Sequence, residues 1–164
     1  MSVSTAIDSA ALRHALGHFA TGVTVVTSLD GDGAPVGTTA NAVSSVSLDP
    51  PLILVCFAKD SLTLGHVAEH GAFAVNVLGH HHEEASSAFA RRGAADAWEK
   101  VTHRSGHTGV PRVDDAIAVF DCTVEHRIPG GDHEIVIGRV VDVEAAGGTP
   151  LLFYRGAYAR LESA

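Results

Sequence analysis

Two long apolar segments, residues 117–127 and 134–143, constrain the fold of this chain more than any other feature. Valine and isoleucine recur in both segments, and these residues favour extended strands. The segments are joined at Pro129-Gly130-Gly131-Asp132, where glycine can adopt the positive φ angles of a tight turn without steric cost. The sequence therefore predicts two long strands joined by a turn.

The same arrangement occurs nearer the N-terminus. The β-branched run 23–27 predicts a strand, Asp30-Gly31-Asp32-Gly33 predicts a hairpin turn, and residues 35–47 predict the return strand with its extension. Further strands are predicted over residues 52–57, 72–77, 151–154 and 157–161. The chain is therefore expected to hold six or seven strands that are joined mostly by turns.

About three helices are predicted. The first begins at Asp8 or Ser9 and ends at Gly22, with Leu12, Ala15, Leu16 and Phe19 on one face. The second is opened by Ser61 or Thr63 and runs through Val67, and the third spans residues 80–92 with Ala85, Ala88 and Phe89 directed inward. Residues 93–111 have weak periodicity and predict a long excursion. Since turns rather than helices join the strands, we expect a mainly-β antiparallel barrel with short flanking helices.

Length and composition favour one domain that spans residues 1–164, with residues 1–9 as a flexible N-terminal segment. Hydrophobic residues make up 46% of the chain and charged residues only 18%, so we expect a homodimer to cover part of the apolar surface. Cys56 and Cys122 both lie in apolar runs, which is typical of buried structural thiols rather than of a disulfide framework or a zinc site.

Charge and hydropathy argue against several classes of partner. The formal net charge is −8 and no run of Lys or Arg is present, so we expect no nucleic-acid partner. Residues 1–9 lack the pattern of a signal peptide, and no apolar run approaches the ~20 residues of a membrane helix. We therefore expect a cytoplasmic protein without a membrane partner.

The first candidate binding segment is Gly37–Ser47, which is rich in small and hydroxyl-bearing residues. Short side chains allow a flat ligand to lie against the backbone, where hydroxyl groups and N–H groups can hydrogen-bond it. A flavin or dinucleotide phosphate would suit these donors. The alternative is a tight strand crossing followed by a serine-rich loop.

The second candidate is Ala58–Thr63, which follows a strand and leads into a helix. Lys59 supplies positive charge, while Ser61, Thr63 and the first amides of the helix supply hydrogen-bond donors for a phosphate. The alternative is an ordinary capped helix start.

The third candidate is Gly130–Glu134, in which His133 could pack against a nicotinamide or hydrogen-bond a cofactor; the alternative is a solvated hairpin tip. The run His80-His81-His82 predicts a solvated helix start without a metal, because adjacent histidines on a helix point in different directions. The chain has no Gly-x-Gly-x-x-Gly, Walker A or Gly-x-Ser-x-Gly motif, and nothing indicates covalent catalysis.

Five blocks of the sequence, in this order, closely resemble the short-chain flavin reductases, which are the reductase components of two-component flavin-dependent monooxygenases. The blocks are Leu12–Thr27, Gly37–Pro51, Phe73–Leu78, Gly131–Val140 and Pro150–Tyr158, and the second block contains the sequence NAVSSVSLDPP. Together they cover nearly the whole chain. The sequence departs from the family pattern at three places. Many relatives have Ser at the position of Ala42, residues 80–87 have unusual His and Glu content, and residues 92–107 match poorly.

The resemblance implies an FMN-binding split barrel, a homodimer with flavin near the interface, and NADH or NADPH as electron donor. It assigns Thr38, Thr39, Ala40 and Asn41 to the isoalloxazine ring, and Ser44, Ser45 and Ser47 to the ribityl chain or phosphate. Lys59, Ser61 and Thr63 would complete the phosphate site, and His133 would help to hold the nicotinamide. Tyr154, Arg155 and Tyr158 would lie near the cofactor or the partner subunit.

The implied activity is hydride transfer from NAD(P)H to FMN or FAD, followed by release of reduced flavin to a partner monooxygenase. The absence of an Arg pair for a 2′-phosphate favours NADH. Three alternatives remain open: a flavin store or sensor on the same fold, an enzyme similar to pyridoxal-phosphate oxidases, and a structural barrel without activity. The few clustered cations argue against the second of these.

Overall fold

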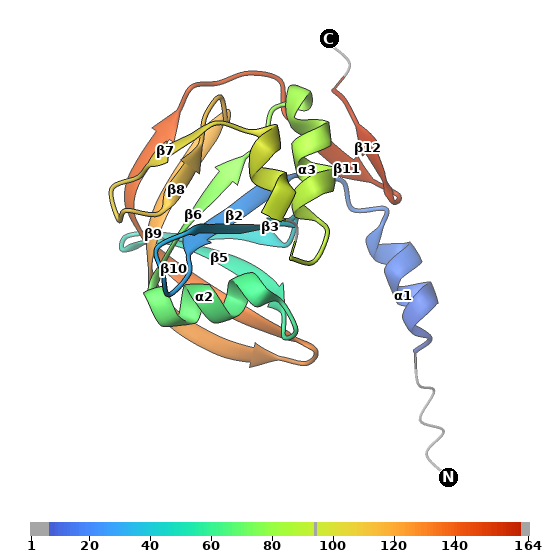
Figure 1. The fold of residues 1–164 in the computed structure, drawn as a ribbon. Helices are drawn as coiled ribbons and strands as arrows, with labels where there is room; N and C mark the ends of the chain where they lie inside the picture. The colour runs from blue at the N-terminus through green and yellow to red at the C-terminus, as the bar shows by residue number, and fades with distance from the viewer. Residues whose placement is uncertain (1–6, 94, 162–164) are drawn as a thin grey trace.

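The computed structural model describes residues 7–93 and 95–161. Its main element is a seven-stranded antiparallel sheet with the strand order β3-β2-β6-β9-β10-β5-β4 (Figure 1). The strands are β2 (Thr24–Leu29), β3 (Pro35–Ala40), β4 (Val43–Leu48), β5 (Pro51–Ala58), β6 (Ala72–Val77), β9 (Ala118–Gly130) and β10 (His133–Ala145). The two longest strands, β9 and β10, form the predicted hairpin. Ala118 lies opposite Ala145 at its open end, and Gly130 lies opposite His133 at its tip.

The sheet curls but does not close through a continuous ladder, because β3 and β4 are its two edges. The two-residue link Asn41–Ala42 joins these edges, and the amide of Cys56 in β5 donates to the carbonyl oxygen of Ala42 at 2.9 Å. The predicted class, a mainly-β split barrel, is therefore confirmed. It holds twelve strands in the described part of the chain, more than the six or seven expected.

Two short sheets complete the β structure. The first contains β1 (Thr21–Gly22), β11 (Leu152–Tyr154) and β12 (Ala157–Ala159), and the second contains β7 (His103–Ser105) and β8 (Pro111–Val113). The excursion predicted over residues 93–111 contains secondary structure: it holds the 3₁₀ helix η2 (Ala95–Lys100) and much of the β7–β8 hairpin. The turn residue Gly109, with φ of +87°, allows this hairpin to form.

Two apolar clusters form most of the core. Inside the curled sheet, Val26, Val55, Phe73 and Val136 pack against Val67 of helix α2 (Leu62–His70). The second cluster joins β2 to helix α3 (Glu83–Phe89), which follows η1 (His80–His82), and to η2. Its buried members are Val23, Val25, Leu78, Ala88, Phe89, Ala97 and Leu151. Helices α2 and α3 therefore lie against β3 and β2 from separate sides, as Figure 1 shows.

The structure corrects three predicted elements. Helix α1 (Ser9–Leu16) is capped by Asp8 as expected, but it ends at Gly17 instead of Gly22, so Phe19 lies beyond it. The predicted return strand 35–47 is two strands, because β4 turns away from β2 and pairs with β5. The predicted helix 80–92 ends at Phe89, although Ala85, Ala88 and Phe89 are buried as expected. Residues 1–6 of the segment expected to be flexible lie outside the described residues.

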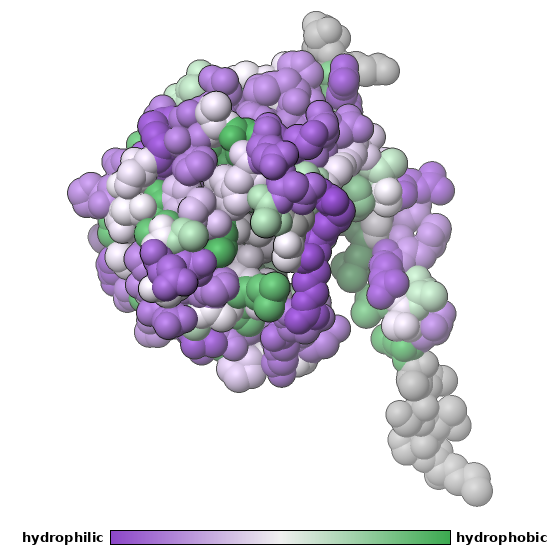
Figure 2. Space-filling view, in the orientation of Figure 1, coloured by the Kyte–Doolittle hydropathy of each residue, from purple (hydrophilic) through white to green (hydrophobic). Residues whose placement is uncertain are grey.

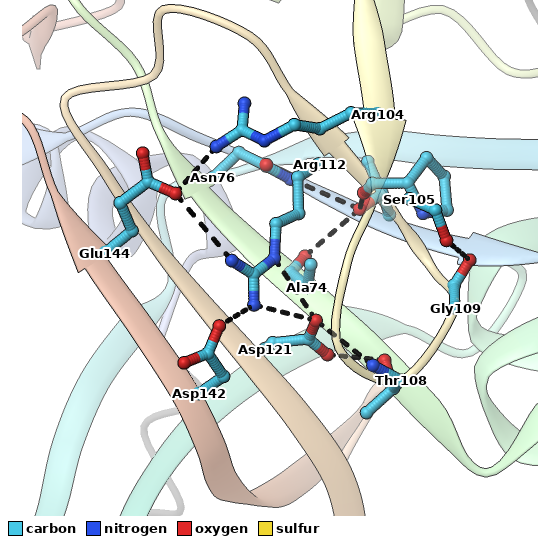
Figure 3. Close-up of polar contacts among 12 residues, drawn as sticks. Ala74, Asn76, Arg104, Ser105, Thr108, Gly109, Arg112, Asp121, Asp142 and Glu144 are labelled. Carbon is cyan, nitrogen blue, oxygen red and sulfur yellow. Dashed lines mark hydrogen bonds and ion pairs between the residues drawn. The ribbon is translucent and has the colours of Figure 1, made fainter.

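A buried ion pair fixes the β7–β8 hairpin to the main sheet (Figure 3). The guanidinium of Arg112 in β8 donates to Asp121 of β9 at 3.0 Å and also to Asp142 of β10, and the Asp121 side chain is fully buried. The Thr108 hydroxyl donates to the same Asp121 carboxylate. Asn76 of β6 accepts a hydrogen bond from the Val113 amide at 2.8 Å. These contacts satisfy charges that would otherwise be costly to bury.

No helix among the described residues is both long and apolar enough to cross a bilayer.

Candidate functional site

A cavity of about 220 Å³ lies where β3, the end of β5 and the tip of the β9–β10 hairpin meet. We call it the ring cavity. Its lining residues are mostly small: Thr38, Thr39, Ala40, Asn41, Ala42, Cys56, Phe57, Ala58, Ser61 and His133. Six of the residues predicted from sequence, namely Thr38, Thr39, Ala40, Asn41, Ser61 and His133, are therefore brought together from three separate segments.

Strand register explains how His133 reaches this cavity. His133 lies opposite Ala58 in the β10–β5 ladder, and the amide of Lys59 donates to the carbonyl oxygen of Asp132 at 3.1 Å. Gly131, with φ of +69°, allows the tight turn that begins β10. The hairpin tip is thereby held beside the start of α2, and the His133 side chain is half-exposed at the rim of the cavity.

The neighbouring carboxylate orients the His133 ring. Nδ1 of His133 lies 2.7 Å from Oδ1 of Asp132. The hydrogen bond and the positive charge that the ring can carry lower the pKa of Asp132, so this carboxyl group stays ionised near neutral pH. With Nδ1 engaged, Nε2 is the nitrogen left to contact a ligand.

Strand alternation gives the β3 residues different roles. The Thr39 hydroxyl donates to the carbonyl oxygen of Ser86 in α3 at 2.6 Å, so it is engaged on the helix side of the strand. Ala40 packs against the inner cluster of the barrel. The Thr38 hydroxyl has no side-chain hydrogen bond within the described part of the chain, while Asn41 Nδ2 donates to Thr21 Oγ1 at 3.2 Å. Thr38 and the Asn41 carbonyl group thus remain available to a ligand.

The predicted phosphate segment lies at the N-terminus of α2. The Ser61 side chain caps this helix by accepting from the Leu64 amide at 3.4 Å. Lys59 is exposed and makes no ion pair with a described residue. Thr63 is buried and lines the adjoining cavities instead of the ring cavity. The capped helix start and the cation are therefore both present beside the ring cavity.

The structure does not bring the β4 serines into the ring cavity. Ser44 and Ser45 are exposed on the edge strand β4, where they pair with Leu54 and Ile53 of β5. Ser47 is half-buried and accepts from the Asp49 amide at 3.2 Å. A ligand would have to extend along β4 to contact them.

The three predicted C-terminal residues also lie outside the ring cavity. Tyr154 is exposed, with its ring 6.1 Å from that of His18, and the Arg155 amide donates to the carbonyl oxygen of Gly17 at 2.8 Å. The Tyr158 hydroxyl lies 2.8 Å from the Ser86 hydroxyl of α3. Tyr154 and Arg155 are therefore placed beside the N-terminal helix, and Tyr158 beside α3.

Two lining residues, Cys56 and Phe57, lie outside the predicted segments, and two more, Ala42 and Ala58, lie within them but were not assigned a role. The position of Cys56 and Phe57 directly before the Lys59 segment was the signal that could have found them. Cys56 was expected to be a buried structural thiol, but it is only half-buried, because it faces this cavity. Burial nevertheless raises its pKa, and it raises the pKa of buried Cys122 to about 12, so neither is set up as a thiolate nucleophile.

The histidine run differs from its prediction. His82 is buried rather than solvated, and its ring lies 4.0 Å from that of His81. Burial lowers the pKa of His82, and the neighbouring His81 lowers it further. No group of three or more metal-binding side chains occurs among residues 7–93 and 95–161.

Comparison with known proteins identifies the family. Residues 16–162 match the flavin reductase like domain. A protein of Rhizobium meliloti (strain 1021) named "Probable flavin reductase" is 47% identical over 92% of this chain and 48% of its own length. The reductase component of flavin-dependent trigonelline monooxygenase from Acinetobacter baylyi is 44% identical over 90% of this chain and 47% of its own length. The chain thus spans about half the length of these two relatives.

A solved structure agrees with this assignment. The NADH:FAD oxidoreductase SgcE6 of Streptomyces globisporus C-1027, in complex with NAD and FAD fragments, superposes with a TM-score of 0.88 at 36% identity. The match covers 94% of this chain and 93% of that protein. On the extent of these matches, the chain belongs to the flavin reductase like domain family.

Proposed function

We propose that this protein is an NAD(P)H-dependent flavin reductase that reduces FMN or FAD by hydride transfer, with NADH as the preferred donor. The observation that carries the proposal is the ring cavity. Short side chains on β3 line it, His133 lies at its rim, and Lys59 and Ser61 lie beside it at the start of α2. The family match and the two relatives named as reductases support the same activity.

The cavity suits a planar ring with a phosphate tail. The short side chains of Thr38, Ala40 and Ala42 leave space above the strand, and a cavity of this kind favours a flat ligand. Lys59, the Ser61 hydroxyl and the first amides of α2 would hold the phosphate through charge and hydrogen bonds. Ser44, Ser45 and Ser47 would contact the ribityl chain only where it follows β4.

The residues of the protein would position the flavin and the nicotinamide and would not themselves take part in the reaction. A bound flavin supplies the hydride acceptor, and the cofactors carry the electronic part of the reaction. His133 would hold the nicotinamide over the cavity, with its ring fixed by Asp132. The walls of the cavity would keep the two rings in contact, at about 3–3.5 Å between the reacting atoms. No side chain is required as an acid or a base.

A partner monooxygenase and a homodimer complete the proposal. The relative from Acinetobacter baylyi is named as a reductase component of a monooxygenase, and we propose that this chain likewise supplies reduced flavin to such an enzyme. Exposed apolar residues on and beside α1 would be covered in a homodimer; they include Leu12, Leu16 and Phe19. Tyr154 and Arg155, which lie beside this helix, would then be near the partner subunit.

A second candidate is a flavin store or sensor without reductase activity. The short side chains of β3 that line the ring cavity would be enough for that role. The placement of His133 at the rim, with one ring nitrogen fixed by Asp132, favours the reductase because a store needs no nicotinamide contact.

Steady-state oxidation of NADH and of NADPH, each with FMN, FAD and riboflavin in turn, tests the proposal. We expect NADH to be oxidised rapidly and only when flavin is added. Tight flavin binding without oxidation of either nucleotide would support the store, and failure of all three flavins to bind would reject both candidates.

A further inference from the structure

The small sheet of β1, β11 and β12 contains one row of residues that connects it to the ring cavity at both ends. Thr21 of β1 lies opposite Phe153 of β11, and Phe153 lies opposite Tyr158 of β12. Residues directly opposite each other in antiparallel strands project from the same face of the sheet. We call Thr21, Phe153 and Tyr158 the cross-strand row. Its two outer members each carry a hydroxyl group.

The first end of the row holds Asn41, which lines the ring cavity. Asn41 Nδ2 donates to Thr21 Oγ1 at 3.2 Å. Because the amide nitrogen is engaged in this way, the carbonyl oxygen of the same side chain keeps one direction. Without the Thr21 hydroxyl, the amide group would be free to rotate and to present its nitrogen in place of its oxygen. Thr21 therefore fixes which polar atom of Asn41 is offered to a ligand.

The other end of the row reaches β3 through α3, and Figure 1 shows the β11–β12 hairpin beside this helix. The Tyr158 hydroxyl lies 2.8 Å from the hydroxyl of Ser86, which is fully buried. The Thr39 hydroxyl donates to the carbonyl oxygen of the same Ser86 at 2.6 Å. One residue of α3 thus links Tyr158 to Thr39 in the ring cavity.

Helix α3 is packed so closely on β3 that the two move together. A Cβ atom added at Gly37 would lie 3.1 Å from the Phe89 ring, so this ring lies directly against the β3 backbone. Phe89 also belongs to the apolar cluster against which Phe153 and Tyr158 pack. Because close-packed interiors transmit displacements, the position of α3 decides the position of β3 between Gly37 and Thr39.

The alignment of the reacting rings depends on where β3 lies. β3 is an edge strand that pairs only with β2 among the described strands, and its residues line the ring cavity. Misplacing the reacting groups by about 1 Å can lower a rate about 100-fold. The two ends of the cross-strand row supply part of the support that a second neighbouring strand would give.

We propose that Thr21 and Tyr158 are positioning residues for hydride transfer. Thr21 holds Asn41, and Tyr158 holds Thr39 through Ser86, so β3 keeps the flavin ring at the distance that the nicotinamide needs. Neither Thr21 nor Tyr158 is among the described residues that line the ring cavity, so both act through other residues. The inference rests on the proposed function, because hydride transfer occurs here only if the protein is a flavin reductase.

Single-turnover bleaching of bound flavin by saturating NADH tests the inference in Thr21→Val and Tyr158→Phe. Each change removes one hydroxyl group and keeps the shape of the side chain nearly unchanged. We expect the rate to fall about tenfold in each variant, the change that corresponds to one lost hydrogen bond. The flavin Kd should change much less, because neither side chain lines the cavity. Thr21→Ser keeps the hydroxyl and should retain most of the wild-type rate.

Two neighbouring serines of α3 provide a matched pair of variants. Both contact the Tyr158 hydroxyl, since Ser87 Oγ donates to it at 3.3 Å, but the carbonyl oxygen that Thr39 bonds belongs to Ser86. Ser86→Ala breaks the link to Tyr158 and should be as slow as Tyr158→Phe, whereas Ser87→Ala should react like wild type. Chemical denaturation of each variant checks that it is folded under the conditions of the assay.

The outcomes separate this inference from the proposed function. Wild-type bleaching rates in folded Thr21→Val and Tyr158→Phe would overturn the inference alone and would leave these residues a structural role. Weaker flavin binding with an unchanged rate at saturation would also overturn it, since the row would then act on binding and not on alignment. Equal rates in Ser86→Ala and Ser87→Ala would overturn the link from Tyr158 to β3. A wild-type flavin that NADH does not bleach would reject the proposed function itself.

Discussion

His133 lies opposite Ala58 across the β10–β5 ladder, so the tip of the longest hairpin meets the start of α2. The register runs without a shift from His133 to Arg139 on β10, which ties the position of the imidazole to the core of the barrel. The position of His133 in the candidate site therefore depends on a strand pairing that joins segments more than seventy residues apart in the sequence.

Replacing His133 with alanine should raise the KM for NADH about tenfold, with a much smaller change in flavin affinity, because the ring is proposed to contact the nicotinamide. Steady-state kinetics at saturating flavin measures this. His126→Ala, on the exposed part of the same hairpin, should behave as wild type. Loss of flavin binding with an unchanged KM would show that His133 belongs to the flavin site instead.

Replacing Lys59 with alanine should weaken flavin binding about five- to tenfold, since an exposed cation beside a phosphate contributes a modest, salt-dependent attraction. Flavin titrations at low and high salt would measure both effects. Lys100, the only other lysine in the chain, pairs with Glu84 at 2.6 Å and does not line the ring cavity, so Lys100→Ala is the control. Equal flavin affinity in Lys59→Ala and wild type would remove Lys59 from the phosphate site.

Replacing Asp121 with alanine should lower the free energy of unfolding by about 3–5 kcal/mol, because it leaves the Arg112 guanidinium buried without its main partner. Chemical denaturation measures the loss. Arg91→Ala breaks an exposed pair and should leave stability almost unchanged. A small effect of Asp121→Ala would mean that Asp142 alone compensates Arg112.

Stability should fall in mild acid because of His82. Burial lowers the pKa of this side chain in the folded protein, whereas an unfolded histidine titrates near about 6.5. The unfolded chain therefore binds the proton more readily, and stability is complete above about pH 6.5 and decreases as the pH falls below it. Asp115 opposes the shift, and His81 reinforces it.

Thermal unfolding of wild type and His82→Gln at about pH 7.5 and about pH 5.5 would measure this contribution. The difference in Tm between the two pH values should be smaller in His82→Gln than in wild type. The same pH dependence in both proteins would assign the acid sensitivity to other groups.

Placing a charge among the exposed apolar residues at the end of α1 and just beyond it should disrupt the proposed homodimer. Leu16 and Phe19 are 63% and 77% exposed. Leu16→Asp and Phe19→Asp should therefore lower the stability of an isolated chain little, but they should strongly destabilise a dimer with an apolar interface at this place. Light scattering after size-exclusion chromatography would measure the mass. A dimer that persists in both variants would exclude this face from the interface.

Local sequence patterns predicted the β9–β10 hairpin, the Asp30–Gly33 turn, strand β6 and the Ser61 cap well, because each depends on nearby residues. The departure of β4 from β3 was not predictable in this way, since it depends on pairing with β5 across the barrel. The length of α1 was overestimated because Phe19 continues the apolar spacing of the helix after the chain has left it.

The candidate site was predictable in part for the same reason. The residues that share the ring cavity were found as three separate segments. The β10–β5 register brings two of them together, and the curl of the sheet brings β3 to the same place. The distance of Tyr158 from the cavity follows from its contact with Ser86 of α3, a partner 72 residues away. The adjoining cavities that Thr63 lines also need α2, β3 and the segment after α3 side by side, which no local pattern records.

Anaerobic mixing of the protein, NADH and one equivalent of FAD tests the central claim most directly. If β3 and His133 hold the two rings in contact, the visible absorbance of the flavin should bleach at the same rate as the nicotinamide band disappears, and far faster than without protein. A flavin that binds but keeps its colour in the presence of excess NADH and NADPH would contradict the claim.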